Sequence, residues 1–161
     1  MKRLFDLVFS LLVLTVFLPF GIIISLLILF SSGGGVFYRQ ERIGKGGVAF
    51  KLFKFRSMRK NSDKIGTLTV GMRDSRITRV GVFIRKYKLD EFPQFINVLI
   101  GNMSIVGPRP EVKEFVDLYT KEQRKVLEVK PGITDYASLE YFNENALLAK
   151  SNDPKKTYIE E

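Results

Sequence analysis

Residues 7–32 read LVFSLLVLTVFLPFGIIISLLILFSS, and this uncharged run decides how the rest of the chain can be organised. A helix of about 20 apolar residues crosses a bilayer, so the run is long enough to do so. A secretory signal peptide fits less well, because the run is too long and no small-residue cleavage site follows it. The sequence therefore predicts a membrane helix at the start of the chain.

The flanking charges and a central proline bear on the topology of this helix. Cations lie on both sides of the run, at Lys2, Arg3, Arg39, Arg42 and Lys45. Because cytoplasmic segments are enriched in Lys and Arg, both ends are drawn to the same side. Pro19 leaves the carbonyl of Thr15 unbonded and bends the axis, and hydroxyls at Ser10, Thr15 and Ser25 can bond backbone groups locally. We expect a re-entrant helix over residues 1–32, kinked at Pro19, with an ordinary single span as the alternative.

Composition limits the chemistry that the rest of the chain can perform. The formal charge of +9 indicates an anionic partner: nucleic acid, anionic lipid or a phosphorylated substrate. The chain has no cysteine and no histidine, which excludes disulfides, thiolate and imidazole metal sites, and Ser-His or Cys-His catalysis. A catalytic centre would therefore use carboxylates, cations or hydroxyls, and its metal would be a hard ion such as Mg²⁺.

The stretch Lys88-Leu89-Asp90-Glu91-Phe92-Pro93-Gln94 places two adjacent carboxylates beside several cations. We expect a helix to begin here, with Pro93 in its first turn and with free backbone N–H groups near both acids. The helix dipole would then keep Asp90 ionised, as a nucleophile or a metal ligand. The alternative is a helix-capping acid with a solvated neighbour.

A second candidate is Gly107-Pro108-Arg109-Pro110, in which two prolines restrict the backbone around one guanidinium. A rigidly placed arginine fork suits a phosphate group. A purely structural turn is the alternative interpretation of this stretch.

The pattern of apolar residues and turns predicts an α+β fold that is mainly helical, with amphipathic interfacial helices and a small β-hairpin. The hairpin is expected from Val36–Gln40 and Val48–Phe55 around the turn at 44–47. Helices are expected over 76–88, from Asp90 to Ile100, and over 111–128. A loop is expected over 60–75, a strand over 136–141 and the start of a helix at 146–150.

Lysines and arginines alternate with aromatic and apolar residues over positions 50–59. Such a pattern can stack bases of a nucleic acid, or it can place phenylalanines among lipid headgroups while the cations meet lipid phosphates. The apolar run directly upstream favours the membrane interpretation.

From about Lys2 to Asn143 the chain resembles a bacterial sugar transferase of the monotopic phosphoglycosyl transferase family. No single motif is specific, but their order and spacing are. Besides the apolar segment with Pro19, they are Tyr38–Gly44, Lys54–Met58, Arg73–Thr78, Gly81–Arg85, Leu89–Gln94, Asn97–Leu99, Gly101–Ser104, Gly107–Pro110 and Lys130–Thr134.

The resemblance implies an enzyme on the cytoplasmic face of the bacterial inner membrane, with residues 1–32 as re-entrant helix and residues 33–161 as catalytic domain. Such an enzyme moves a phospho-sugar from a UDP-sugar to polyprenyl phosphate, such as undecaprenyl phosphate, and releases UMP. By motif position, Asp90 would be the nucleophile and a contact of Mg²⁺, with Glu91 as its partner. Arg85 and Arg109 would bind substrate phosphate.

Besides the donor and acceptor, we expect contact with inner-membrane lipid and none with nucleic acid. A homodimer is one candidate assembly, and the sequence does not reveal the oligomeric state. The rival hypothesis is a non-enzymatic, membrane-anchored basic protein that binds anionic lipid or nucleic acid. The chain departs from the family pattern at Gly34-Gly35, at Tyr87-Lys88 and over 135–143, so the sugar is not predicted. Family members usually continue beyond the position of Glu161, and we expect the second domain to be truncated at its C-terminus.

Overall fold

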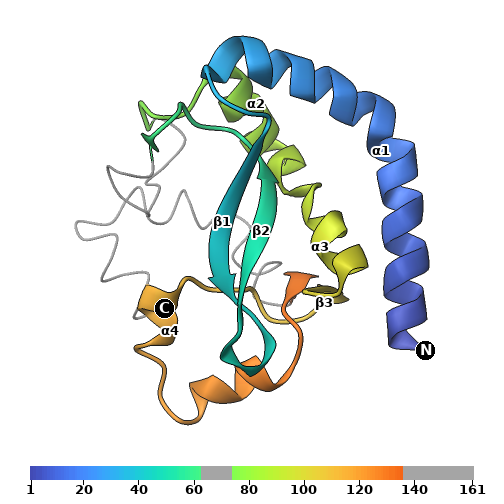
Figure 1. Cartoon of the computed structure of the whole chain (residues 1–161), viewed down its shortest axis with the longest axis vertical. Helices are drawn as coiled ribbons and strands as arrows, with labels where there is room; N and C mark the ends of the chain where they lie inside the picture. The colour runs from blue at the N-terminus through green and yellow to red at the C-terminus, as the bar shows by residue number, and fades with distance from the viewer. Residues whose placement is uncertain (63–73, 136–161) are drawn as a thin grey trace.

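The computed structural model describes residues 1–62 and 74–135, and in that part the chain forms an α+β fold (Figure 1). Its α-helices are α1 (Lys2–Ser32), α2 (Arg79–Lys86), α3 (Gln94–Ile100) and α4 (Lys113–Val116). Its strands are β1 (Phe37–Ile43), β2 (Ala49–Phe55), β3 (Ser104–Val106) and β4 (Gly132–Thr134). Short 3₁₀ turns are η1 (Lys45–Gly47), η3 (Leu89–Glu91) and η4 (Gln123–Glu128). The fold class expected from the sequence is confirmed.

Helix α1 is continuous through Pro19, and Figure 1 shows it turning near its middle into a second arm that leads to β1. The hydroxyls of Thr15 and Ser25 donate to the carbonyls of Leu11 and Gly21, one helical turn back. The expectation for Ser10 is wrong, because its buried hydroxyl has no hydrogen-bond partner among the described residues. Within this part of the chain, α1 is the helix that is long and apolar enough to cross a membrane.

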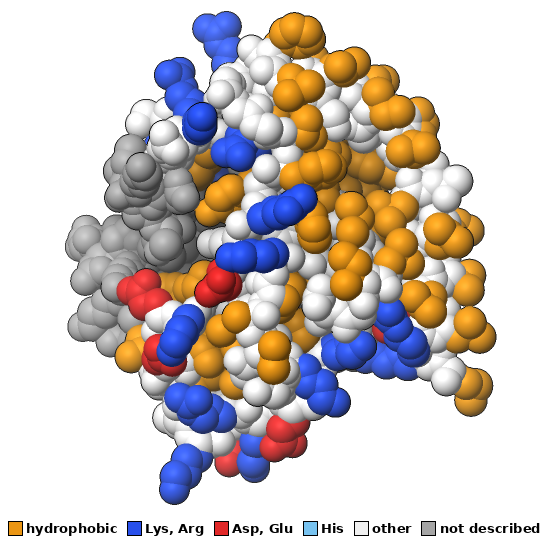
Figure 2. Space-filling model, viewed as in Figure 1, with side chains coloured by type: hydrophobic (Ala, Val, Ile, Leu, Met, Phe, Trp, Pro, Cys, Tyr) orange, Lys and Arg blue, Asp and Glu red, His pale blue; other side chains and the backbone are white. Residues whose placement is uncertain are grey.

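Both ends of α1 are attached to the same folded unit. At the start, Lys2 Nζ donates to the carbonyl of Val106, 3.0 Å away, and the Arg3 guanidinium donates to carbonyls near the end of α3. At the other end, Arg56 Nε donates to the carbonyl of Gly35 over 2.7 Å. Between its ends, α1 presents exposed Leu, Ile, Val and Phe side chains, seen as the orange band along the top and right of Figure 2.

The β-hairpin predicted from the sequence is present, with a longer first strand than expected. β1 and β2 pair antiparallel, from Phe37 opposite Phe55 to Ile43 opposite Ala49, and glycines at positive φ close the turn. The free edge of β2 is covered by the buried amide of Asn97, which accepts from Phe53 N–H and donates to the Lys51 carbonyl. Helix α3 is thereby fixed against the hairpin.

The main core lies between α1, α2 and the hairpin and consists of Ile24, Ile28, Phe55 and Ile84. Phe17 of α1 and Phe92, which follows η3, extend it with stacked rings whose centroids are 3.8 Å apart. A second cluster of Leu52, Val98 and Met103 joins β2, α3 and the start of β3. Helix α1 is therefore packed directly against the residues that flank the acid pair.

The prediction of a single helix over 111–128 is wrong. The chain instead forms α4 and the separate turn η4. The reason is local, because Thr120 N–H donates to the Gln123 side chain and Gln123 N–H donates to the Thr120 hydroxyl. These reciprocal bonds start the new turn η4 at a point where a longer α4 would have continued.

Three predictions lie wholly or mainly outside the described residues: most of the loop over 60–75, the strand over 136–141 and the helix start at 146–150. The helix expected over 76–88 is shorter, because Thr78 caps α2 by accepting from Gly81 N–H over 2.8 Å. Its basic last turn, with Arg85 and Lys86, is as expected.

Gly81 is required by the close approach of α2 to the chain after β2. A Cβ atom at this position would overlap the carbonyl oxygen of Ser57. We expect Gly81→Ala to lower the free energy of unfolding by about 2–3 kcal/mol, because backbone must move to admit the methyl group. Thermal unfolding in detergent measures the effect. Gly35→Ala is the control, since nothing lies within 4 Å of its added Cβ; equal midpoints for the two variants would contradict this packing.

Candidate active site

The acid pair lies in a 3₁₀ turn rather than in the first turn of a helix. η3 contains Asp90 and Glu91, and α3 begins only at Gln94, with Pro93 as its N-cap. Lys88, just before the turn, has φ of 55°, which costs a non-glycine residue about 1 kcal/mol. The turn is held from both sides, because Leu89 and Phe92 pack on the core that α1 completes.

Asp90 is buried, with 8% of its surface exposed. Burial raises the pKa of its carboxyl, and Glu91 adds to the rise, while the charges of Lys54 and Arg85 act in the opposite direction. The expectation that a helix dipole favours the ionised form of Asp90 is not met, because the turn η3 packs against α2 and β2 and the resulting loss of water raises the pKa. A carboxylate with a raised pKa is more basic and less solvated, which favours attack on an electrophile.

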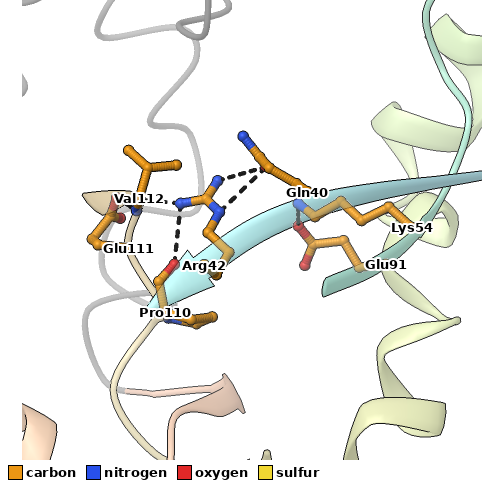
Figure 3. A network of polar contacts seen from close by, with 7 residues as sticks. All are labelled: Gln40, Arg42, Lys54, Glu91, Pro110, Glu111 and Val112. Atoms are coloured by element: carbon orange, nitrogen blue, oxygen red, sulfur yellow. Dashed lines mark hydrogen bonds and ion pairs between the residues drawn. The ribbon is translucent and has the colours of Figure 1, made fainter. Parts of the chain in front are cut away.

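Glu91 differs from its neighbour in its ion-pair partner and in the direction of its pKa shift. Its Oε1 accepts from Lys54 Nζ over 2.9 Å, as Figure 3 shows. Burial alone would raise the pKa of Glu91, but the charges of Lys54 and Arg109 outweigh it and lower the pKa to about 2. Glu91 is thus a fixed anion, whereas Asp90 is the carboxyl with the raised pKa.

The two predicted arginines both act on this acid pair. Burial lowers the pKa of the Arg85 guanidinium, whereas the charges of Asp90 and Asp74 raise it. Arg85 interacts with these acids through charge, as a largely buried cation beside the pair. Arg109 is exposed, and its charge helps to lower the pKa of Glu91. The structure therefore brings Asp90, Glu91, Arg85 and Arg109 into one electrostatic site.

The loop that carries Arg109 is held on several sides. Gly107 N–H donates to the Thr134 carbonyl, and Gly132 N–H donates to the Pro108 carbonyl. Arg109 N–H donates to Asp135 Oδ2 over 3.1 Å. The backbone on either side of the guanidinium is therefore fixed by bonds to β4 and to the residue that follows it.

Arg42 of strand β1 also holds the loop that carries Arg109. Arg42 Nη1 donates to the Pro110 carbonyl over 3.1 Å and forms an ion pair with Glu111 at 3.2 Å. Its other guanidinium nitrogens donate to Gln40 (Figure 3). The Pro-Arg-Pro turn is thereby tied to β1, which supports both the structural interpretation and a fixed direction for Arg109.

Sequence reasoning missed Lys54 and Arg42 as members of this site. Both lie in motifs that carry the family resemblance, but Lys54 was assigned to the membrane surface. Lys54 is two residues beyond buried Leu52 in β2, so strand alternation would have placed it on the same face of the hairpin as that core residue. Its partner Glu91 is 37 residues away in sequence, so the pairing itself had no local signal.

The expected Mg²⁺ site can be compared only with the side chains that could supply oxygen ligands. Among residues 1–62 and 74–135 no group of three or more acidic side chains could hold an ion. Mg²⁺ commonly uses one or two carboxylates and completes its shell with water and substrate phosphates. The adjacent carboxyl groups of Asp90 and Glu91 fit that arrangement, with a phosphorylated substrate supplying the remaining oxygens.

Together these residues place the buried carboxyl group of Asp90 among the charges of Lys54, Arg85 and Glu91. Such a site can attack a phosphorus atom, because neighbouring cations offset the repulsion between two anions. The carboxylate itself needs no histidine to remove a proton.

Three proteins similar to this chain have names that describe transfer of a sugar phosphate to undecaprenyl phosphate. A putative undecaprenyl-phosphate N-acetylgalactosaminyl 1-phosphate transferase of Bacillus subtilis is 45% identical over 121 residues, covering 75% of this chain and 68% of the relative. A UDP-N-acetylgalactosamine-undecaprenyl-phosphate N-acetylgalactosaminephosphotransferase of Aeromonas hydrophila is 41% identical, covering 86% and 33%. The UDP-glucose:undecaprenyl-phosphate glucose-1-phosphate transferase of Escherichia coli is 42% identical, covering 86% and 31%.

The chain thus spans about two thirds of one of these relatives and about a third of the other two. A family model described as "Bacterial sugar transferase" matches residues 1–161. On this match, and on the identity to the Bacillus relative, the chain belongs to the bacterial sugar transferase family.

Proposed function

We propose that this protein is an enzyme that transfers a phospho-sugar from a UDP-sugar to polyprenyl phosphate, such as undecaprenyl phosphate. The names of the relatives support the class of donor and acceptor. The observation that carries the proposal is the contrast within the acid pair: a buried Asp90 with a raised pKa beside a Glu91 held as an anion by Lys54. The reaction would be the first membrane step in the assembly of a glycan.

The proposed reaction has two displacements at one phosphorus. A carboxylate oxygen of Asp90 attacks the β-phosphorus of the UDP-sugar, and the bond from that phosphorus to the bridging oxygen breaks. UMP leaves with the bonding electron pair, and the phospho-sugar stays on Asp90 as an acyl phosphate. An oxygen of polyprenyl phosphate then attacks the same phosphorus and releases the Asp90 carboxylate. The product is a polyprenyl diphosphate sugar.

The cations near Asp90 would offset the negative charge that the proposed reaction brings together. Arg85 and Arg109 would bind diphosphate oxygens, and the exposed guanidinium of Arg109 is the one nearer to solvent. Lys54 keeps Glu91 ionised and also favours the ionised form of Asp90. Mg²⁺, held by Asp90 with Glu91 nearby, would supply further positive charge at the diphosphate.

We further propose that residues 1–32 form a re-entrant membrane helix and residues 33–161 a catalytic domain on the cytoplasmic face of the inner membrane. Two observations support this topology. Lys2 and Arg3 contact the same unit as the residues that follow α1, and the helix surface between them is apolar. A straight span would have to break the contacts at one end.

Asp90→Asn should reduce the release of UMP by at least about a thousandfold, or ~4 kcal/mol in the barrier, because an amide is a poor nucleophile toward phosphorus. The assay combines protein in lipid nanodiscs, a UDP-sugar, Mg²⁺ and undecaprenyl phosphate. Intact mass without acceptor should show one phospho-sugar on the unmutated protein and none on the variant. Asp117→Asn is the control, since Asp117 forms an exposed pair with Lys113. If Asp90→Asn kept a tenth of the activity, Asp90 would not be the nucleophile.

Lys54→Met should move the acid limb of the pH–rate profile to higher pH. Asp90 must be ionised to attack, so activity is present above its folded pKa and is lost as pH falls through it. The charge of Lys54 lowers that pKa, and removing the charge raises it further. Lys51→Met is the matched control on the same strand, because Lys51 pairs with exposed Glu41. An acid limb that stays in place, or moves down, would show that Lys54 does not act on the titrating group.

A cysteine inserted directly after Met1 should be protected from a membrane-impermeant thiol reagent in intact cells and labelled by a permeant one. The chain has no other cysteine, so the label reports that position alone. Protection is expected because the N-terminus and the catalytic domain face the same compartment. Labelling by the impermeant reagent would mean that the helix spans the membrane.

A further inference from the structure

The first turns of α1 contain one buried acid, Asp6, whose exposed fraction is 4%. Its carboxylate accepts from the Ser104 hydroxyl, at 2.9 and 3.2 Å from its two oxygens, and from Ile105 N–H at 3.2 Å. These bonds join residues almost a hundred positions apart in sequence. The acid is therefore bonded specifically to strand β3 and is not a solvated residue at a helix end.

Lys2 and Arg3, close to Asp6 in α1, also bond α1 to β3 and to α3. Lys2 Nζ donates to the carbonyl of Val106, the last residue of β3. The Arg3 guanidinium donates to the carbonyls of Val98 and Leu99 at 2.6 and 2.9 Å, near the end of α3. Hence α1 bonds to each residue of β3 and, separately, to the helix that follows the acid pair.

Strand β3 has little support from its own sheet. It has three residues and pairs with the equally short β4, and an isolated pair of strands is marginal in water. The chain passes from Val106 directly into Gly107–Pro110, so the position of β3 sets where that loop starts. The bonds to β4, Asp135 and Arg42 hold the loop beyond this point.

We propose that Asp6 is a positioning residue for the transfer reaction, which fixes β3 and thereby the direction of the Arg109 side chain. The inference rests on the proposed function. A carboxylate suits this role because it accepts from two donors at once, and charge-assisted hydrogen bonds are stronger than neutral ones. Asp6→Asn removes the charge, and the Ser104 hydroxyl would have to accept from the amide instead of donating to a carboxylate, so the attachment to β3 becomes weaker.

A double-mutant cycle separates positioning from simple anchoring of the helix. Asp6→Asn is combined with Arg109→Lys, and kcat and KM for UMP release are measured for all four proteins. We expect Asp6→Asn to lower kcat by about tenfold when Arg109 is intact, and by less than about threefold in the Arg109→Lys background, because both changes disturb one interaction. Equal factors in both backgrounds would overturn the proposal.

Ser10→Ala is the matched control, one turn further along α1. The Ser10 hydroxyl is as buried as Asp6 but has no partner among the described residues, so its loss should leave kcat unchanged. Ser104→Ala keeps the bond from Ile105 N–H and should give a smaller loss in the same direction as Asp6→Asn. It serves as the test variant if Asp6→Asn does not fold.

Hydrogen exchange of the full chain in nanodiscs tests the geometry without relying on activity. Peptides covering 104–110 should exchange faster in Asp6→Asn than in the unmutated protein or Ser10→Ala, while β1 and β2 should not change. Unchanged exchange over 104–110, or an equal rise throughout, would overturn the inference. An unmutated protein that releases no UMP while this exchange difference is present would refute the proposed function and leave the link from Asp6 to β3 standing.

Discussion

The structure depends on one constraint: an apolar helix of 31 residues has both ends bonded to the same folded unit. The helix stays continuous through Pro19, and the hydroxyls of Thr15 and Ser25 donate to carbonyls one turn away, as a helix placed in hydrocarbon would require. The inner side of the bent helix then packs Ile24 and Ile28 on the core. Helices α2 and α3 and strand β3 also contact α1.

Burial of the turn η3 against α2 and β2 explains part of the electrostatics of the candidate site. Asp90 and Glu91 are neighbours in sequence, yet their pKa values shift in opposite directions. Asp90 loses water and gains no ion pair within the described part of the chain, whereas Glu91 gains Lys54 at 2.9 Å. A chain without histidine thus obtains two different carboxyl groups from burial and one ion pair: Glu91 is fixed as an anion, and the pKa of Asp90 is raised.

Local features of the fold were predictable from the sequence, and long-range ones were not. The apolar run and the glycines between β1 and β2 have composition signals within a short window, and both elements formed as expected. The reciprocal bonds between Thr120 and Gln123 are also local. The prediction of one helix over 111–128 followed the apolar periodicity instead, and it was wrong. The candidate residues were found by motif, whereas the burial of Asp90 and the contact from Lys54 depend on elements far away in sequence.

Asn97 has a consequence for association between molecules. A two-stranded sheet ordinarily leaves open edges that can recruit a strand from another chain and begin aggregation. On β2, one amide side chain occupies the backbone donor of Phe53 and the acceptor of Lys51, as a neighbouring strand would. Strand addition at that stretch of β2 is thereby blocked by a single residue of α3.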